Sequence, residues 1–152
     1  MAADFTLTST DFEDGGEIPR DHTCDGADTS PALEWNGAPD DAQALALIVD
    51  DPDARAFVHW IVYDMTATQS GGLPQGYSAS PDAPAQGTND FRRTGYGGPC
   101  PPSGTHRYVF TLYALSEPTG LSGAPRGDEV RDALRGRILA EATLTGTYTR
   151  AR

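Results

Sequence analysis

The chain has 152 residues, the usual length of one domain, so we expect a single domain over residues 1–152. It carries 11 basic and 22 acidic residues, so its formal net charge is −11, and every basic residue is an arginine. The absence of lysine excludes a phosphate-binding loop that needs Lys and excludes a lysine Schiff base. The negative charge argues against nucleic acid and against an anionic membrane surface as partners.

The acidic residues are spread along the chain rather than gathered in a tail, and apolar residues make up 38% of the composition. This apolar content supports a packed core rather than a disordered chain. At molar salt the Debye length shrinks to about 3 Å, which screens the repulsion among surface carboxylates. We therefore predict a surface adapted to high salt and a halophilic, archaeal source.

The chain contains no apolar run long enough to cross a bilayer, since its longest run, residues 44–49, has six residues. Its first residues include neither the basic segment nor the apolar segment of a secretion signal. We therefore expect no membrane span and a cytoplasmic location.

Short runs of aromatic, aliphatic and β-branched residues predict strands. In chain order these runs cover residues 5–9, 33–35, 43–51, 57–65, 106–115 and 143–149. The run 43–51 is apolar at nearly every position, so we expect its sheet to be covered on both faces. The stretch 66–102 reads as mostly loop, and a loop of that length in a compact domain tends to serve function. Within the run 106–115, His106 and Tyr108 share one face because strand side chains alternate.

One helix is predicted late in the chain, from about Asp128 to about Glu141. Asp128 suits the N-cap position. Val130, Leu134 and Ile138 recur at i, i+4 and i+8 and form an apolar stripe. Several antiparallel strands with long loops and one late helix indicate a mostly β fold, either a sandwich or a barrel.

Three segments place polar groups where predicted strands meet loops. The first, residues 50–53, follows a buried strand, and the second places His59 among large apolar residues. The third, residues 95–108, is rich in glycine and proline and includes His106 and Tyr108. A glycine-rich turn directs backbone N–H groups outward and favours an anion-binding concavity. Two imidazoles and a phenol add hydrogen-bond donors to such a site.

The remaining histidine and the two cysteines give weaker signals. His22 lies in a polar stretch, so we expect it at the surface. Cys24 and Cys100 have no C-x-x-C spacing, and each is typical of a small buried residue. The alternative is a single disulfide between them, which would form in an oxidising compartment.

Together these segments resemble the phosphatidylethanolamine-binding protein (PEBP) family, also called Raf kinase inhibitor-like proteins, and are similar to its bacterial and archaeal branch. The resemblance covers essentially the whole chain. The motifs that carry it are Asp51-Pro52-Asp53-Ala54, His59-Trp60-Ile61-Val62-Tyr63-Asp64-Met65, residues 97–108, Ser30-Pro31-Ala32-Leu33-Glu34-Trp35 and Gly146-Thr147-Tyr148. In one departure, Arg55 stands where the family usually has proline.

The resemblance implies a sandwich of two antiparallel sheets with a small anion-binding cavity at one end. The implied ligand is phosphate, a phosphorylated headgroup or a carboxylate, and no cofactor is implied. The implied role is a binding module, with regulation of a protein partner as in Raf kinase inhibitor-like proteins. The implied binding residues are Asp51, His59, Gly98, Pro99, His106 and Tyr108.

Two other classes of function stay open at this point. Asp51, His59 and His106 are also a candidate two-His-one-carboxylate metal triad, and one imidazole is a candidate general base for a hydrolase. The chain has neither a G-x-S-x-G nor an H-E-x-x-H motif, so we favour binding over catalysis. A third class is an interaction protein, as a homodimer or with another partner, that uses a surface patch on residues 66–102.

Overall fold

The computed structural model describes residues 4–80 and 85–150. Seven strands and one α-helix form its regular structure, with three short 3-10 turns between them. The elements are β1 (Thr6–Thr8), β2 (Leu33–Asn36), β3 (Ala44–Asp51), β4 (Phe57–Thr66), β5 (Gly71–Leu73), β6 (Gly104–Leu115), α1 (Gly127–Leu134) and β7 (Ile138–Arg150). Among the described residues, no helix is long and apolar enough to cross a membrane.

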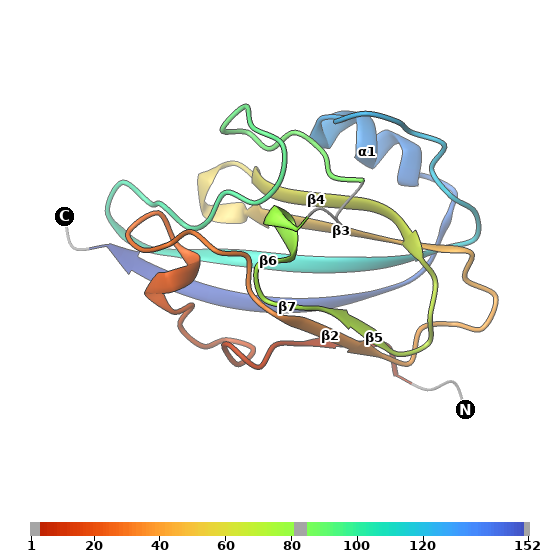
Figure 1. The fold of residues 1–152 in the computed structure, drawn as a ribbon, viewed down its shortest axis with the longest axis horizontal. Coiled ribbons are helices and arrows are strands. Elements are labelled where there is room, and N and C mark those ends of the chain that lie inside the picture. The colour runs from red at the N-terminus through yellow and green to blue at the C-terminus, as the bar shows by residue number, and fades with distance from the viewer. Residues whose placement is uncertain (1–3, 81–84, 151–152) are drawn as a thin grey trace.

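The strands form two sheets, as predicted (Figure 1). The smaller sheet has the order β1-β2-β5, and the larger has the order β4-β3-β6-β7. Within these sheets every described pairing is antiparallel. The fold is therefore the mostly β sandwich of two antiparallel sheets with one late helix that the sequence indicated.

The larger sheet is covered on both faces, by the smaller sheet on one side and by α1 on the other (Figure 1). Alternate residues of β3 point to opposite faces. Leu45 and Leu47 pack in the cluster between the sheets, whereas Ala46 and Ile48 pack with Val130 of α1. This arrangement explains why β3 is apolar at nearly every position.

The helix is shorter than predicted. Val130 and Leu134 are buried as the stripe requires, but α1 ends at Leu134 rather than near Glu141. Gly136 has a φ of +79°, the left-handed conformation that commonly terminates helices. Ile138 then begins β7, where its side chain is exposed.

Candidate functional site

Four side chains predicted to bind a ligand meet at one end of the larger sheet. Asp51 ends β3, His59 lies in β4, and His106 and Tyr108 lie near the beginning of β6. Because β3 pairs with both β4 and β6, these positions come together although they are distant in sequence. They line a cavity of about 180 Å³, which we call the His/Asp/Tyr pocket. Its other lining residues are Ala54, Phe57, Phe91, Cys100, Pro101 and Pro102.

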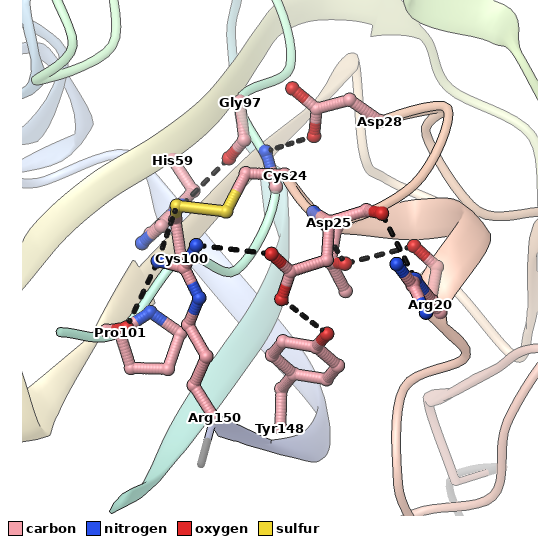
Figure 2. Close-up of a disulfide and its surroundings, with 12 residues drawn as sticks. Arg20, Cys24, Asp25, Asp28, His59, Gly97, Cys100, Pro101, Tyr148 and Arg150 are labelled. Atoms are coloured by element: carbon pink, nitrogen blue, oxygen red, sulfur yellow. Dashed lines mark hydrogen bonds and ion pairs between the residues drawn. A yellow bond between two sulfur atoms is a disulfide. The ribbon is translucent and has the colours of Figure 1, made fainter. Parts of the chain in front are cut away.

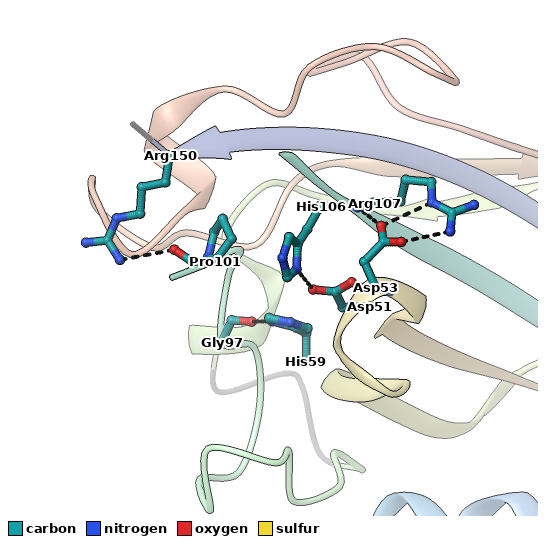
Figure 3. A network of polar contacts seen from close by, with 8 residues as sticks. All are labelled: Asp51, Asp53, His59, Gly97, Pro101, His106, Arg107 and Arg150. Carbon is teal, nitrogen blue, oxygen red and sulfur yellow. Dashed lines mark hydrogen bonds and ion pairs between the residues drawn. The ribbon is translucent and has the colours of Figure 1, made fainter. Parts of the chain in front are cut away.

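Asp51 and His106 form a hydrogen-bonded pair within the pocket (Figure 3). Nδ1 of His106 donates to Oδ2 of Asp51 over 2.6 Å. The second oxygen of Asp51 accepts the backbone N–H of Asp53 at 2.8 Å and so caps the short 3-10 turn Pro52–Ala54. An ionised carboxylate only accepts, so this contact places a proton on Nδ1 of His106 and turns Nε2 away from Asp51.

His59 has the same arrangement with a different acceptor. Its Nδ1 donates to the backbone carbonyl of Gly97 over 2.7 Å (Figure 3). The residue is 4% exposed, and burial lowers the pKa of His59, although the Gly97 carbonyl and the charge of Asp51 partly oppose this effect. The ring is therefore neutral at neutral pH, with its proton on Nδ1.

Tyr108 brings a buried hydroxyl to the pocket. The residue is 1% exposed, and its hydroxyl proton has no acceptor among the described residues. Burial raises the pKa of Tyr108, and the charges of Asp51 and Asp53 raise it further. The phenol therefore keeps its proton and is a neutral donor.

An ion pair between Arg107 and Asp53 holds the turn that follows Asp51. Arg107 donates to both carboxylate oxygens of Asp53, at 2.9 and 3.1 Å, and these hydrogen bonds lower the pKa of Asp53 to about 2 (Figure 3). The chain then turns toward β4 through Arg55 and Ala56, which have φ of +57° and +59°. Proline is locked near a φ of about −65°, so Arg55 occupies a conformation that proline cannot adopt.

Gly98 and Pro99, which the resemblance implied as ligand-binding residues, are not among the residues that line the pocket. The N–H of Gly98 donates to the carboxylate of Asp28 at 2.8 Å. Proline has no N–H, and the carbonyl of Pro99 accepts the N–H of Cys24 at 3.1 Å. These two residues therefore use their hydrogen bonds to fix the neighbouring loop.

A disulfide joins Cys24 and Cys100, with their Cα atoms 5.4 Å apart (Figure 2). The expectation of two small buried residues is therefore wrong, because the sulfurs are bonded and Cys24 is exposed. Arg150 pairs with Asp25 at 3.1 Å, and the Tyr148 hydroxyl donates to the same carboxylate at 2.7 Å (Figure 2). Since Cys100 lines the pocket, the disulfide ties one pocket wall to the loop before β2.

His22, expected at the surface, is 2% exposed, and that prediction is wrong. Its Nδ1 donates to the carbonyl of Thr29 over 2.7 Å, and its own carbonyl accepts the hydroxyl of Tyr96 at 2.6 Å. Nε2 lies 3.6 Å from a carboxylate oxygen of Asp11. These contacts make His22 a structural residue outside the pocket.

The described residues contain no group of three or more His, Cys, Asp and Glu side chains placed to hold one metal ion. Asp51, His59 and His106 therefore do not form the ligand triad that was left open. The carboxylate of Asp51 instead orients His106 and caps a turn.

A larger hollow of about 480 Å³ lies between β4 and β5 and is lined in part by Trp35, Tyr63 and Asp64. Both carboxylate oxygens of Asp64 accept hydrogen bonds from Thr119, at 2.7 and 2.9 Å. This hollow lacks the convergent imidazoles of the His/Asp/Tyr pocket, which is the stronger candidate site.

Comparison with known sequences extends over nearly the whole chain. Residues 8–149 match the family model described as phosphatidylethanolamine-binding protein. A UPF0098 protein of Methanothermobacter thermautotrophicus is 44% identical over 144 residues, covering 91% of this chain and 95% of that protein. A UPF0098 protein of Aquifex aeolicus is 44% identical over 149 residues, covering 93% and 86%. LppC of Mycobacterium tuberculosis, named as a lipoprotein, is 40% identical over 159 residues, covering 97% and 73%.

Two solved structures share the fold. A crystal structure from Chlamydia trachomatis, described as a PEBP homologue, has a TM-score of 0.88 and 37% identity and covers 99% of each chain. Escherichia coli YbcL, described as a new member of the mammalian PEBP family, has a TM-score of 0.85 and 31% identity and covers 97% of this chain and 99% of its own. The relatives come from archaea and bacteria and include a named lipoprotein. The archaeal source, salt adaptation and cytoplasmic location therefore stay predictions.

Proposed function

Because the chain belongs to the phosphatidylethanolamine-binding protein family, we propose that it is a binding module for a small anion. The binding residues in this proposal are Asp51, His59, His106 and Tyr108. Gly98 and Pro99 take an indirect part, by holding the loop that precedes the pocket wall.

The Tyr108 hydroxyl is the observation that carries the proposal. A buried polar group left without a partner costs about 1–3 kcal/mol, so such groups are rare in folded proteins. This hydroxyl lacks a partner among the described residues, and it belongs to a residue that lines a cavity with two imidazoles. A ligand oxygen bound there would accept a hydrogen bond from the Tyr108 hydroxyl.

Size and charge define the class of ligand. Pockets for drug-sized molecules occupy about 300–1,000 Å³, whereas this one holds about 180 Å³. Phosphate, a phosphorylated headgroup or a carboxylate fits that volume, and a whole lipid does not. The net charge of −11 repels anions at long range, so affinity must come from short, fixed hydrogen bonds. Salt would screen the repulsion and help binding.

The second part of the proposal is regulation, in which the bound anion controls a protein partner, as the name Raf kinase inhibitor-like suggests for the family. The residues of this pocket do not identify a kinase. We therefore propose an anion-dependent partner without assigning its class.

Isothermal titration of the protein with inorganic phosphate, O-phosphoethanolamine and acetate tests the proposal. We expect saturable one-site binding of at least one of them, and we expect His106→Ala to weaken it by about tenfold or more, since a hydrogen bond between the ligand and the imidazole is lost. Thr105→Ala is the matched control, because Thr105 is the exposed neighbour of His106 on β6. Absence of binding by all three anions would contradict the proposal.

A further inference from the structure

The two imidazoles of the pocket present the same atom to a ligand. Nδ1 of His106 donates to the carboxylate of Asp51, and Nδ1 of His59 donates to the carbonyl of Gly97. Neither acceptor can donate in return, so the Nδ1 proton is fixed in both rings. Each Nε2 is therefore a bare acceptor in a neutral ring and becomes a donor only in a cationic ring.

His59 is the ring that stays neutral. It is more deeply buried than His106, since His59 is buried whereas His106 is only partly buried. Phe57 and Phe91 pack against its ring, at centroid distances of 5.1 and 5.3 Å. Burial lowers its pKa, as described above. At neutral pH its Nε2 offers a lone pair.

The charged and titratable groups around His59 come from three sides. Asp51 faces it from β3, His106 and Tyr108 from β6, and Asp28 from the loop before β2. The two carboxylates attract a proton to the imidazole, but burial has the larger effect. The lone pair therefore persists in this environment.

The carboxylate of Asp51 adds further acceptors to the same cavity. Its side chain is 3% exposed, and each of its oxygens accepts one hydrogen bond from the protein. A carboxylate has about four lone-pair positions, so acceptor capacity remains. Among the described residues that line the pocket, the imidazoles are the only basic groups. The pocket thus combines the donor of Tyr108 with acceptors and a negative charge.

We infer that the pocket selects oxyanions that still carry a proton, namely hydrogen phosphate and protonated phosphomonoesters, over fully ionised anions such as sulfate. This inference rests on the proposed function, since it requires that anions bind in this pocket. The ligand O–H would donate to Nε2 of His59 or to Asp51, and an ionised ligand oxygen would accept from Tyr108. An anion without a proton leaves the acceptors unpaired and faces the charge of Asp51, which is the more costly arrangement.

Titration of the wild-type protein with phosphate and with sulfate at matched ionic strength and about pH 7 tests this selectivity. We expect phosphate to bind at least about tenfold more tightly, the effect of one unpaired buried group. Equal affinities would overturn the inference and leave anion binding intact. Absence of binding by both anions, together with O-phosphoethanolamine and acetate, would instead defeat the proposed function.

A comparison of inorganic phosphate with O-phosphoethanolamine separates the free ion from a headgroup. A phosphomonoester loses its second proton near about pH 6, whereas inorganic phosphate keeps a proton well above neutral pH. Between about pH 5 and about pH 7.5, affinity for the ester should therefore fall about tenfold more than affinity for phosphate. Protonation changes of the protein affect both ligands alike and cancel in the ratio of the two affinities. A ratio that stays constant with pH would therefore overturn the inference. At about pH 5, tighter binding of inorganic phosphate would indicate the free ion as the ligand, and tighter binding of O-phosphoethanolamine would indicate a headgroup.

The variant Asp51→Asn provides a second test. Its neutral amide removes the charge and supplies a donor, so we expect the preference for phosphate over sulfate to narrow by about tenfold. Asp132→Asn is the matched control, because it makes the same change of charge at an exposed position of α1, away from the pocket lining. We expect that variant to keep the wild-type preference. An unchanged preference in a folded Asp51→Asn protein would contradict the role assigned to this carboxylate.

Discussion

Nδ1 of His106 lies 2.6 Å from Oδ2 of Asp51, although 55 positions separate the two residues along the chain. The same carboxylate caps the turn that follows β3 through the N–H of Asp53. One buried side chain therefore orients an imidazole on β6 and fixes the local path of the backbone. Under the proposed function, both the stability of the fold and the recognition of the ligand depend on this carboxylate.

Replacing Asp51 with alanine should destabilise the fold by about 2 kcal/mol, since it removes an N-cap interaction and leaves a buried donor unpaired. Asp51→Asn should cost less, because its amide oxygen still accepts one of the two hydrogen bonds. Urea denaturation of both variants measures the difference. If both variants lost the same free energy of unfolding, the hydrogen bonds of Asp51 would contribute nothing to stability beyond its charge.

Replacing Tyr108 with phenylalanine should separate binding from stability. Loss of an unpaired hydroxyl should leave the free energy of unfolding unchanged or raise it by about 1 kcal/mol, while phosphate binding weakens by about tenfold. Tyr96→Phe is the opposite case, because the Tyr96 hydroxyl donates to the carbonyl of His22. That variant should lose about 1–3 kcal/mol of stability. Thermal unfolding and calorimetric titration check both, and a Tyr108→Phe protein that binds like wild type would refute the hydroxyl's role.

The buried imidazole of His59 should make stability depend on pH. Its pKa in the folded protein lies below the ordinary value of 6.5, so the unfolded chain binds the proton more tightly. The contribution is fully present above pH 6.5 and is lost as the pH falls through the folded pKa. We expect the urea midpoint of wild type to drop more than that of His59→Gln between about pH 7.5 and about pH 5. If the urea midpoints of the two proteins fell equally with pH, His59 would not be the group responsible for the pH dependence.

Loss of the disulfide should affect both folding and the pocket. Cys24 and Cys100 are separated by 76 positions, and a loop of that size corresponds to about 4.5 kcal/mol of stabilisation. Cys24→Ser should also weaken phosphate binding by about threefold, because the wall formed by Cys100, Pro101 and Pro102 loses its tether. Wild-type protein kept in reductant is the control, and it should show the same losses of stability and of phosphate affinity as Cys24→Ser. Unchanged affinity in both samples would show that the wall holds its position without the bond.

Much of the fold followed from local sequence patterns. The continuous apolar run of β3 indicated a strand with two covered faces, and the larger sheet has that environment. Strand alternation placed His106 and Tyr108 on one face, and both line the pocket. These predictions succeeded because the period of a strand depends on nearest neighbours alone.

Other features depend on distant contacts. Strand β5 contains Gly71 and Gly72, which have low strand propensity, yet a Cβ at Gly71 would stand 2.8 Å from the ring of Trp35. His22 has polar neighbours in sequence and is buried by contacts with Thr29 and Tyr96. The disulfide and the Asp51–His106 pair likewise join segments that only the folded chain brings together.

The aromatic rings around His59 also provide a spectroscopic opportunity. Phe57, Phe91 and Tyr108 place their ring centroids 5.1, 5.3 and 5.2 Å from the imidazole. Ring currents at these distances displace the carbon-bound proton resonances of an imidazole. Since the chain holds only three histidines, the signals of His59 should stand apart in a simple proton NMR spectrum. Occupancy of the cavity is therefore observable at a single atom, without a dye or an isotope label.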